Sequence, residues 1–213
     1  MHARAAAEAE LDAPQQPDRR YPSATLTQTG SSAVKGIIFN LLEEVVAQRY
    51  GEDVWDSLLA EADVDGSYTS LGSYPDDELF RLVGAASAAL DLPADSVVRQ
   101  FGESAIPLLA SRYQSFFDGH LTTRSFLLTL NDIIHPEVKK LYPGADVPNF
   151  AFEQVTDDAL VIRYWSARKL CALAEGFILG AATHYGEKAT VEQPVCMHRG
   201  ADYCLLASSF TPA

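Results

Sequence analysis

The hydrophobic pattern of this chain changes character at Pro148. Upstream of it, apolar residues recur at helical spacing, beginning with Ile37, Ile38, Leu41, Leu42, Val45 and Val46. Downstream, the stretches NFAFEQV and ALVIRYW alternate apolar and polar residues around TDD, which is typical of a β-hairpin. This order predicts an α+β fold with a helical N-terminal lobe (34–148) and an α/β C-terminal lobe (149–213) that contains an antiparallel sheet.

The same periodicities predict the remaining elements. Before residue 148 there are four more helical blocks, at 53–62, 75–91, 93–117 and 122–142. The third block is expected to break into two helices near Gly102, and the fourth is the longest candidate. After residue 148 we expect the helix 166–186, with Ser166 as its N-cap, and two strands around the turn RGAD, at 188–198 and 202–210.

The composition excludes several classes of protein. The chain has 213 residues, is 47% hydrophobic and carries a net charge of −13 at pH 7. This charge disfavours nucleic acid and anionic membranes as partners, because both require a basic face. Acidic residues interrupt the N-terminal segment where a secretion signal needs an apolar core, and no apolar run is long enough to span a membrane. Three cysteines, an odd number, favour a reducing cytoplasm over a disulfide framework.

Residues 1–33 lack a sustained apolar period and are rich in Ala, Gln, Pro, Ser and Thr, which predicts a disordered extension. Helical periodicity begins sharply just after Val34. A valine-type start codon at Val34 would leave residues 1–33 untranslated, and the alternative is a genuine disordered arm.

His135 lies among apolar residues of the predicted helix 122–142. Two explanations for its imidazole are open. It is either a packed core histidine with hydrogen-bonded ring nitrogens or an axial ligand to a haem iron, which needs an apolar pocket and a neutral imidazole. Pro136 lacks a backbone donor and crowds the carbonyl of Asp132, so the helix is expected to bend beside His135.

A second polar group occurs where a strand is expected to lead into a helix. Tyr164, Ser166 and Arg168 are spaced Y-x-S-x-R. Tyr164 and Ser166 point to the same side of an extended strand, and Arg168 is expected on the first helical turn. A phenol, a hydroxyl and a guanidinium that converge near a helix N-terminus can bind a carboxylate. The alternative is that the tyrosine packs, the serine caps the helix and the arginine faces water.

Together these residues resemble the haem–nitric oxide/oxygen-binding (H-NOX) family, which is related to the haem domain of soluble guanylate cyclase. The resemblance covers about Val34 to Phe210 and begins with KGIIFN, where Val34 stands at the family's initiator methionine. His135 matches the proximal haem ligand. Pro148, thirteen residues later, matches the proline that packs against and distorts the haem.

The family's motif that binds the haem propionates is matched by Tyr164, Ser166 and Arg168. The histidine, the proline and this motif occur along the chain in the same order as in the family. Pro136 departs from the family's usual sequence beside the proximal histidine. The resemblance implies a haem b that is held between the two lobes.

The resemblance also implies a switch. Nitric oxide that binds strongly to the iron weakens the bond on the opposite side, to His135. Strain in the haem, held by Pro148 and by Ile37 or Ile38, is then released and the lobes shift as rigid bodies.

The choice of gas is expected to depend on Leu173. Family members that hold O₂ carry a tyrosine at this position, nine residues after the one matched by Tyr164. A leucine gives bound O₂ no hydrogen bond, whereas NO binds ferrous haem without one. The resemblance therefore implies binding of NO and CO with little stable O₂ complex, and Tyr113 and Tyr185 are the alternative donors.

The three cysteines lie in the C-terminal lobe, and CMHRGADYC places His198 between two of them. Cys171, Cys196, Cys204 and His198 could form a tetrahedral zinc site, and the alternative is three small buried side chains. Some bacterial H-NOX proteins have a zinc site of three cysteines and one histidine. The family's histidine position is Gln193 here, so His198 is the candidate fourth ligand.

The resemblance implies a sensor and not an enzyme. Its output is expected in a separate protein, a histidine kinase or a cyclic-di-GMP enzyme. The alternatives are a zinc or thiol redox sensor, with or without haem, and a haem enzyme such as a peroxidase or an NO-detoxifying enzyme. A haem enzyme needs acid or base groups on the gas-binding side, and the surroundings of Leu173 suggest none.

Overall fold

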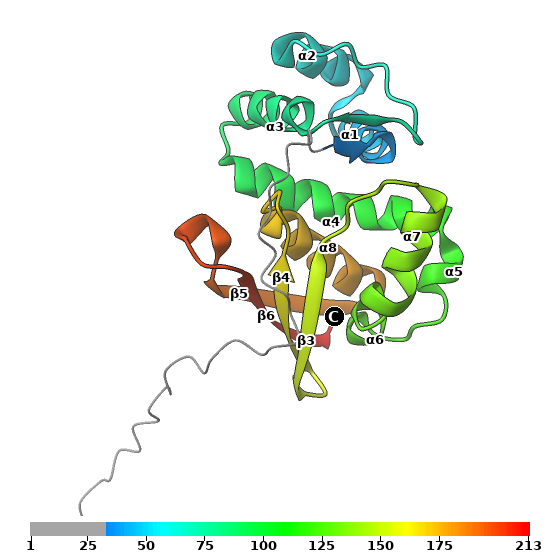
Figure 1. Cartoon of the computed structure of the whole chain (residues 1–213), viewed down its shortest axis with the longest axis vertical. Coiled ribbons are helices and arrows are strands. Elements are labelled where there is room, and N and C mark those ends of the chain that lie inside the picture. Colours follow the sequence, from blue (N-terminus) through cyan, green and yellow to red (C-terminus); the bar gives the residue numbers. More distant parts are fainter. Residues whose placement is uncertain (1–32) are drawn as a thin grey trace, which may run out of the picture. The chain divides into compact units, whose positions relative to one another are not determined.

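The computed structural model describes residues 33–213, apart from the side chains at positions 154 and 155. Figure 1 shows the elements in this part of the chain. The predicted extension at residues 1–33 lies outside the described residues, except for Ala33, and both explanations of it stay predictions. No helix within the described range is long and apolar enough to cross a lipid bilayer.

The first three helices surround an apolar centre. They and the strands beside them are β1 (Ala33–Lys35), α1 (Gly36–Tyr50), α2 (Glu52–Ala62), β2 (Ser73–Pro75) and α3 (Asp76–Leu90). The two strands pair antiparallel. Phe39 is fully buried and stacks on Tyr68, with the ring centroids 4.1 Å apart. Asp63 and Asp91 take up left-handed backbone conformations directly after α2 and α3, which ends each helix.

α4 (Ala94–Arg112) is one continuous helix, so the predicted break near Gly102 is wrong. Gly102 faces α8 (Cys171–His184), where an added Cβ would lie 2.8 Å from the carbonyl oxygen of Leu173. Gly176 on α8 approaches α4 more closely, because a Cβ there would lie 2.1 Å from the carbonyl oxygen of Arg99. The glycines therefore mark a backbone-to-backbone contact between two helices and not a helix end.

The stretch after α4 consists of short pieces. These are α5 (Gln114–Phe117), α6 (Thr123–Leu127), the π-helical turn η1 (Leu130–Ile134) and α7 (His135–Leu141). The prediction of one long helix over 122–142 is therefore wrong. In η1 the amide of Ile134 reaches back to the carbonyl of Thr129, at 3.1 Å. Pro136 has no amide hydrogen for the carbonyl of Asp132, so the expected distortion takes the form of a π-helical turn.

The C-terminal strands form one antiparallel sheet, in the order β3-β4-β6-β5. The strands are β3 (Asn149–Thr156), β4 (Ala159–Trp165), β5 (Glu187–Val195) and β6 (Cys204–Pro212). Both predicted strand pairs are present, and β6 joins them because it also pairs with β4. α8 lies along the sheet between the strands and α4 (Figure 1). This architecture confirms the α+β fold.

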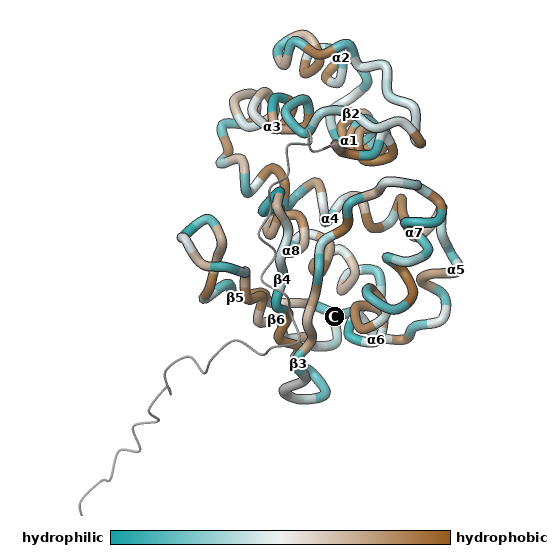
Figure 2. The backbone as a smooth tube through the Cα atoms, in the orientation of Figure 1, coloured by the Kyte–Doolittle hydropathy of each residue, from teal (hydrophilic) through white to brown (hydrophobic). Residues whose placement is uncertain are grey.

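The buried hydrophobic clusters do not follow the predicted boundary between the two lobes at Pro148. One buried cluster centres on Phe39 and Leu82 in α1–α3. Another combines Phe126 of α6 with Leu160 of β4 and with residues of α4 and α8. Figure 2 shows hydrophobic residues along α4, α8 and β6, which share this second core. Pro148 therefore marks the start of the four-stranded sheet, and it is not the boundary between hydrophobic cores.

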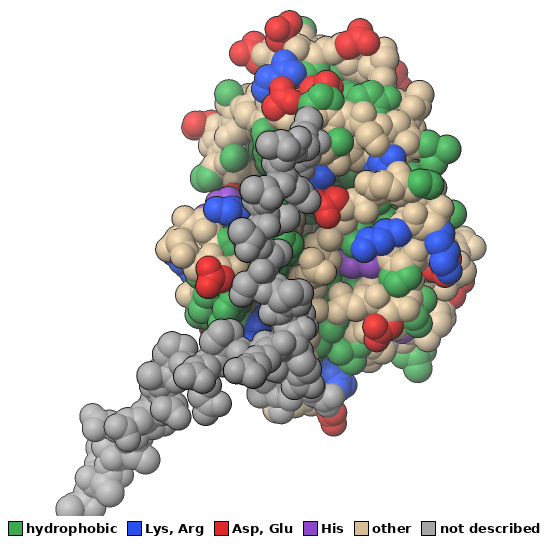
Figure 3. Space-filling view, viewed as in Figure 1, with side chains coloured by type: hydrophobic (Ala, Val, Ile, Leu, Met, Phe, Trp, Pro, Cys, Tyr) green, Lys and Arg blue, Asp and Glu red, His purple; other side chains and the backbone are tan. Residues whose placement is uncertain are grey.

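Acidic side chains gather over α2 and α3 on the face drawn in Figure 3. The exposed acids of these two helices and the loop between them include Glu52, Asp53, Asp56, Glu61, Asp63, Asp65 and Asp77. Such a face repels phosphate groups, in keeping with the negative net charge of the chain.

Candidate functional site

A cavity of about 620 Å³ reaches from α1 and α3 to α7, α8 and the strand β4. Its walls are largely apolar, and its size suits a cofactor or small molecule. All eight residues that were predicted to contact a haem line this cavity: Ile37, Ile38, His135, Pro148, Tyr164, Ser166, Arg168 and Leu173. The structure therefore brings these eight residues, which are distant in sequence, to one cavity.

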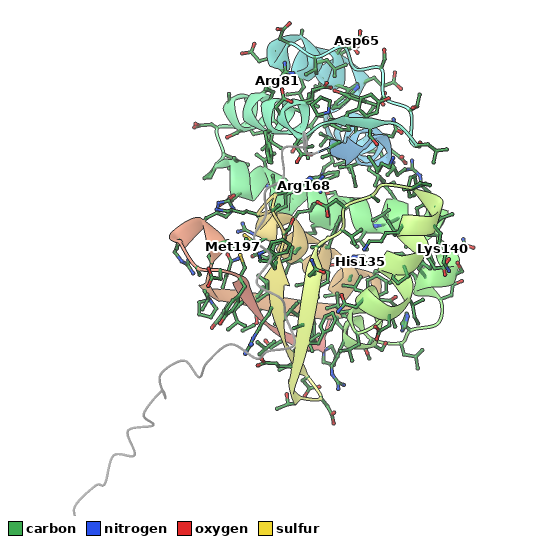
Figure 4. The ribbon with its side chains drawn as sticks, viewed as in Figure 1. Asp65, Arg81, His135, Lys140, Arg168 and Met197 are labelled. Atoms are coloured by element: carbon green, nitrogen blue, oxygen red, sulfur yellow. The ribbon has the colours of Figure 1, made fainter. Side chains whose placement is uncertain are left out.

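His135 is the first residue of α7 and follows the π-helical turn directly (Figure 4). Its ring lies against Phe150 of β3, with centroids 5.5 Å apart. Burial, with a smaller contribution from the charge of Lys139, lowers the pKa of His135 to about 4. The imidazole is thus neutral at pH 7, as a metal ligand must be. Among residues 33–213, no hydrogen bond joins another residue to its ring nitrogens.

Tyr164 presents its phenol from β4, and Ser166 follows in a turn. Burial is the main cause that raises the pKa of Tyr164 to about 12, so the phenol remains a hydrogen-bond donor. α8 begins only at Cys171, and the predicted N-cap role of Ser166 is wrong. Lys169 has a left-handed backbone, with φ of 53°, which a helix cannot contain. The hydroxyl of Ser166 instead accepts a hydrogen bond from the amide of Arg168, at 3.3 Å.

Arg168 therefore lies before α8 and not on its first turn, and its side chain is only 9% exposed. Its Nε donates to Asp76 at 2.8 Å, and its Nη1 donates to a carboxylate oxygen of Asp146 at 3.2 Å. Its Nη2 donates to the carbonyl of Ala33 at 2.6 Å. The guanidinium does not face water: it links β1, α3 and the loop before β3 at the edge of the cavity.

Asp76 and Asp146 were not predicted as partners of Arg168. Asp76 opens α3, where an acid is already explained by the positive end of the helix dipole. Asp146 lies in a loop without periodicity. Only the tertiary structure shows that both carboxylates stand beside the residues that would bind propionates.

Leu173 belongs to an apolar wall that joins α1, α4 and α8. Its neighbours there are Leu41, Val45, Phe101 and Ala105. The two tyrosines considered as alternative donors are engaged elsewhere. The hydroxyl of Tyr113 hydrogen-bonds with that of Tyr142, and the hydroxyl of Tyr185 donates to the carbonyl of Phe117 at 3.0 Å.

The structure brings the three predicted cysteines together. Cys171 begins α8, Cys196 follows β5 and Cys204 begins β6, and their sulfur atoms lie within 4.8 Å of one another. All three are buried free thiols. Burial raises the pKa of Cys171, and it raises the pKa of Cys204 to about 12. The thiols of Cys171 and Cys204 are therefore protonated at pH 7, and a thiophilic cation would have to displace these two protons.

His198 does not join the cluster, so the predicted fourth ligand is wrong. It lies on an exposed single turn, and its Nε2 is 2.8 Å from the carbonyl oxygen of Lys169. The side chain of Gln193 lies beside the thiol of Cys171, but its buried Nε2 has no hydrogen-bond partner among the described residues. The pairing of β5 and β6 is irregular here, between Glu192 and Val195. Three thiols suit zinc, but the fourth position offers a carboxamide rather than the nitrogen or sulfur that zinc prefers.

A family model described as haem-NO-binding matches residues 35–193. The chain belongs to the H-NOX family. An H-NOX protein from Shewanella oneidensis in the Fe(II)NO state is 37% identical, with a TM-score of 0.78, over 84% of this chain and 99% of that one. A mutant of an H-NOX protein from the same organism, in the Fe(II) state, is 36% identical, with a TM-score of 0.79, over 84% and 96% of the two chains.

More distant H-NOX structures share the fold. An unliganded Fe(II) protein from K. algicida is 24% identical, with a TM-score of 0.75, over 84% of this chain and 98% of that one. An oxygen complex of another H-NOX domain is also 24% identical, with a TM-score of 0.71, over 84% and 96% of the two chains. H-NOX domains are haem-binding gas sensors, and relatives have been solved with NO, CO and O₂.

Proposed function

We propose that this H-NOX protein senses nitric oxide at a ferrous haem b that is ligated by His135. The observation that carries the proposal is the arrangement of the cavity. A neutral imidazole without a hydrogen-bond partner among residues 33–213 faces the same apolar space as Leu173, Tyr164 and Arg168. Few other ligands require one such imidazole, apolar walls and a carboxylate-binding edge together.

Each residue has a distinct role in this proposal. Tyr164, Ser166 and Arg168 bind the propionates through a phenol, a hydroxyl and a guanidinium. Ile37, Ile38, Pro148 and Leu173 pack against the macrocycle. The haem supplies the iron that binds the gas, and the protein selects among gases. Because the neighbours of Leu173 are hydrocarbon, O₂ would find no donor there, and we infer binding of NO and CO without a stable O₂ complex.

We infer that the output is regulatory and lies in a separate cytoplasmic protein. A histidine kinase or a cyclic-di-GMP enzyme is the partner that the family resemblance implies. The pocket itself contributes binding groups, so we propose no enzymatic activity for it.

His135→Gly tests the ligand assignment. The variant should lose the ferrous absorption spectrum of the wild type, and added imidazole should restore it by occupying the vacated space. His198→Gly is the matched control, because His198 is exposed and outside the cavity. An unchanged spectrum in His135→Gly would refute the assignment. NO-dependent regulation of a neighbouring kinase, lost in His135→Gly, would support the sensor, whereas rapid peroxide turnover would favour a haem enzyme.

A second candidate function rests on the three converging thiols. Zinc bound by Cys171, Cys196 and Cys204 would make this a metal site that responds to thiol oxidation. Purified wild type should then hold one zinc per chain, and Cys196→Ala should lose it. A metal-free protein with three titratable thiols would leave a thiol cluster without zinc.

A further inference from the structure

Two tyrosines that end helices share a hydrogen bond at the edge of the cavity. Tyr113 directly follows α4 and Tyr142 directly follows α7, and their phenol oxygens are hydrogen-bonded to each other. Both side chains also line the cavity. Burial, and then the bond to Tyr113, raise the pKa of Tyr142 to about 12, so the phenol stays protonated at physiological pH.

α7 has few other attachments, although it carries His135. It buries no residue completely, and it is preceded by the π-helical turn that Pro136 enforces. The ion pair between Lys140 and Glu137 stays within the helix. Among hydrogen bonds of the described side chains, the one between Tyr142 and Tyr113 alone ties residues 135–142 to another element.

α4, by contrast, is a fixed support. Its backbone packs directly on α8 at Gly102 and Gly176. Arg99 forms an ion pair with Glu175 of α8, at 2.8 Å. At the C-terminal end, Arg112 pairs with Glu44 of α1. Tyr113 therefore directly follows the end of α4 that is held to α1 by this ion pair.

We propose that Tyr113 and Tyr142 are positioning residues that hold α7, and with it His135, at its place in the cavity. The inference rests on the proposed role of His135 as the iron ligand. His135 begins the short helix α7 and Tyr142 directly follows it, about two turns away, so a constraint at one end is transmitted to the other. With the bond intact, α7 resists displacement when NO weakens the link between the iron and His135. Without it, His135 leaves the iron more readily.

The test uses Tyr142→Phe, Tyr113→Phe and the double variant in the full-length Fe(II) protein. Each substitution removes one hydroxyl and keeps the ring, so packing in the cavity is retained. Hydrogen exchange of residues 135–142 should accelerate about fivefold in each single variant, the effect of one lost hydrogen bond. The double variant should match the single ones, because both hydroxyls serve one bond.

A second measurement, by absorption spectroscopy, gives the fraction of the Fe(II)NO form in which His135 has left the iron. This fraction should rise in both single variants, an effect that loose packing alone would not produce. Tyr185→Phe is the matched control, since its hydroxyl also makes one bond, to the carbonyl of Phe117, but outside α7. It should leave both measurements unchanged.

Three results would overturn the inference: unchanged exchange in α7, additive effects of the two substitutions, or faster exchange with an unchanged fraction of dissociated His135. Failure of the proposed function is seen separately, as an unchanged ferrous spectrum in His135→Gly. The exchange measurement does not depend on that assignment.

Discussion

Tyr164 lies directly opposite Cys204 in the ladder between β4 and β6. Both side chains are buried, 2% and 0% exposed, and both belong to one hydrophobic cluster. The thiols of Cys171 and Cys204 also help to raise the pKa of Tyr164, after burial as the main cause. Tyr164 therefore belongs both to the lining of the cavity and to the surroundings of the cysteine cluster.

Leu173→Tyr should let the ferrous protein retain O₂. The phenol would add a hydrogen-bond donor to an otherwise hydrocarbon wall, and bound O₂ needs such a donor more than NO does. Absorption spectra in air-equilibrated buffer measure the effect. Leu173→Phe controls for the size of the ring, and a stable oxygen complex in that variant would contradict the role of the hydroxyl.

Asp76→Asn should destabilise the protein more than Asp146→Asn. Asp76 is 13% exposed and its pair with Arg168 is buried, whereas Asp146 is 60% exposed. Loss of a partner from a buried pair costs about 3 kcal/mol, and loss from an exposed pair about 1 kcal/mol or less. Urea unfolding measures both free energies. Equal losses would show that Arg168 depends no more on Asp76 than on Asp146.

Gly176→Ala should lower the free energy of unfolding by about 2 kcal/mol or more, because a Cβ would meet the backbone of α4. Gly84→Ala is the matched control on α3. No atom lies within 4 Å of a Cβ at that position, so the better helix propensity of alanine should stabilise the protein by about 0.5–1 kcal/mol. Effects of the same sign in the two variants would contradict the close contact between α4 and α8.

The haem-free chain should gain stability between about pH 4 and pH 6.5 through His135. The pKa of His135 is about 4 in the folded chain and roughly 6.5 when unfolded. As the pH falls, the unfolded chain binds this proton first, so the contribution of His135 is complete above pH 6.5 and lost towards pH 4. It amounts to at most about 3 kcal/mol. Urea unfolding at pH 7 and pH 5 should show a smaller difference for His135→Leu, and equal differences would refute the shift.

Gln193→His should strengthen zinc binding. The side chain at position 193 already lies beside the thiol of Cys171, and an imidazole nitrogen is a far better zinc ligand than a carboxamide. Zinc retained per chain after dialysis against a weak chelator is the measurement. His198→Gln should not change it, because His198 lies outside the cluster. A gain of zinc in neither variant would show that the geometry does not suit the metal.

Hydrophobic periodicity in the sequence is sufficient to predict those helices and strands that bury one face. α1, α2 and α3 begin and end within a few residues of the predicted bounds, and both hairpins are present, because burial of a single face leaves a clear pattern. The cavity residues came from motif resemblance, since Tyr164 and Arg168 carry no periodic pattern of their own.

The predictions that differ from the structure lie where tertiary contacts override the local conformational preference of a residue. Gly102 suggests a helix end by its type, but its role is to admit the backbone of α8. Ser166 looks like an N-cap, yet the left-handed Lys169 delays the helix. His198 shares a sequence segment with two cysteines, but the irregular end of β5 puts Gln193 among them instead. Each of these depends on residues that are distant in sequence or on a backbone irregularity that the pattern does not report.

The order of the strands in the sheet constrains the order in which the sheet can assemble during synthesis. β6 lies between β4 and β5 although it is synthesised after both. Until it has left the ribosome, β4 lacks one neighbour, and Tyr164 lacks the strand that faces it at Cys204. The helices that are synthesised before β6 keep part of their apolar surface exposed to solvent until the sheet is complete. The wall of the cavity at β4 is therefore complete only after β6 has inserted into the sheet.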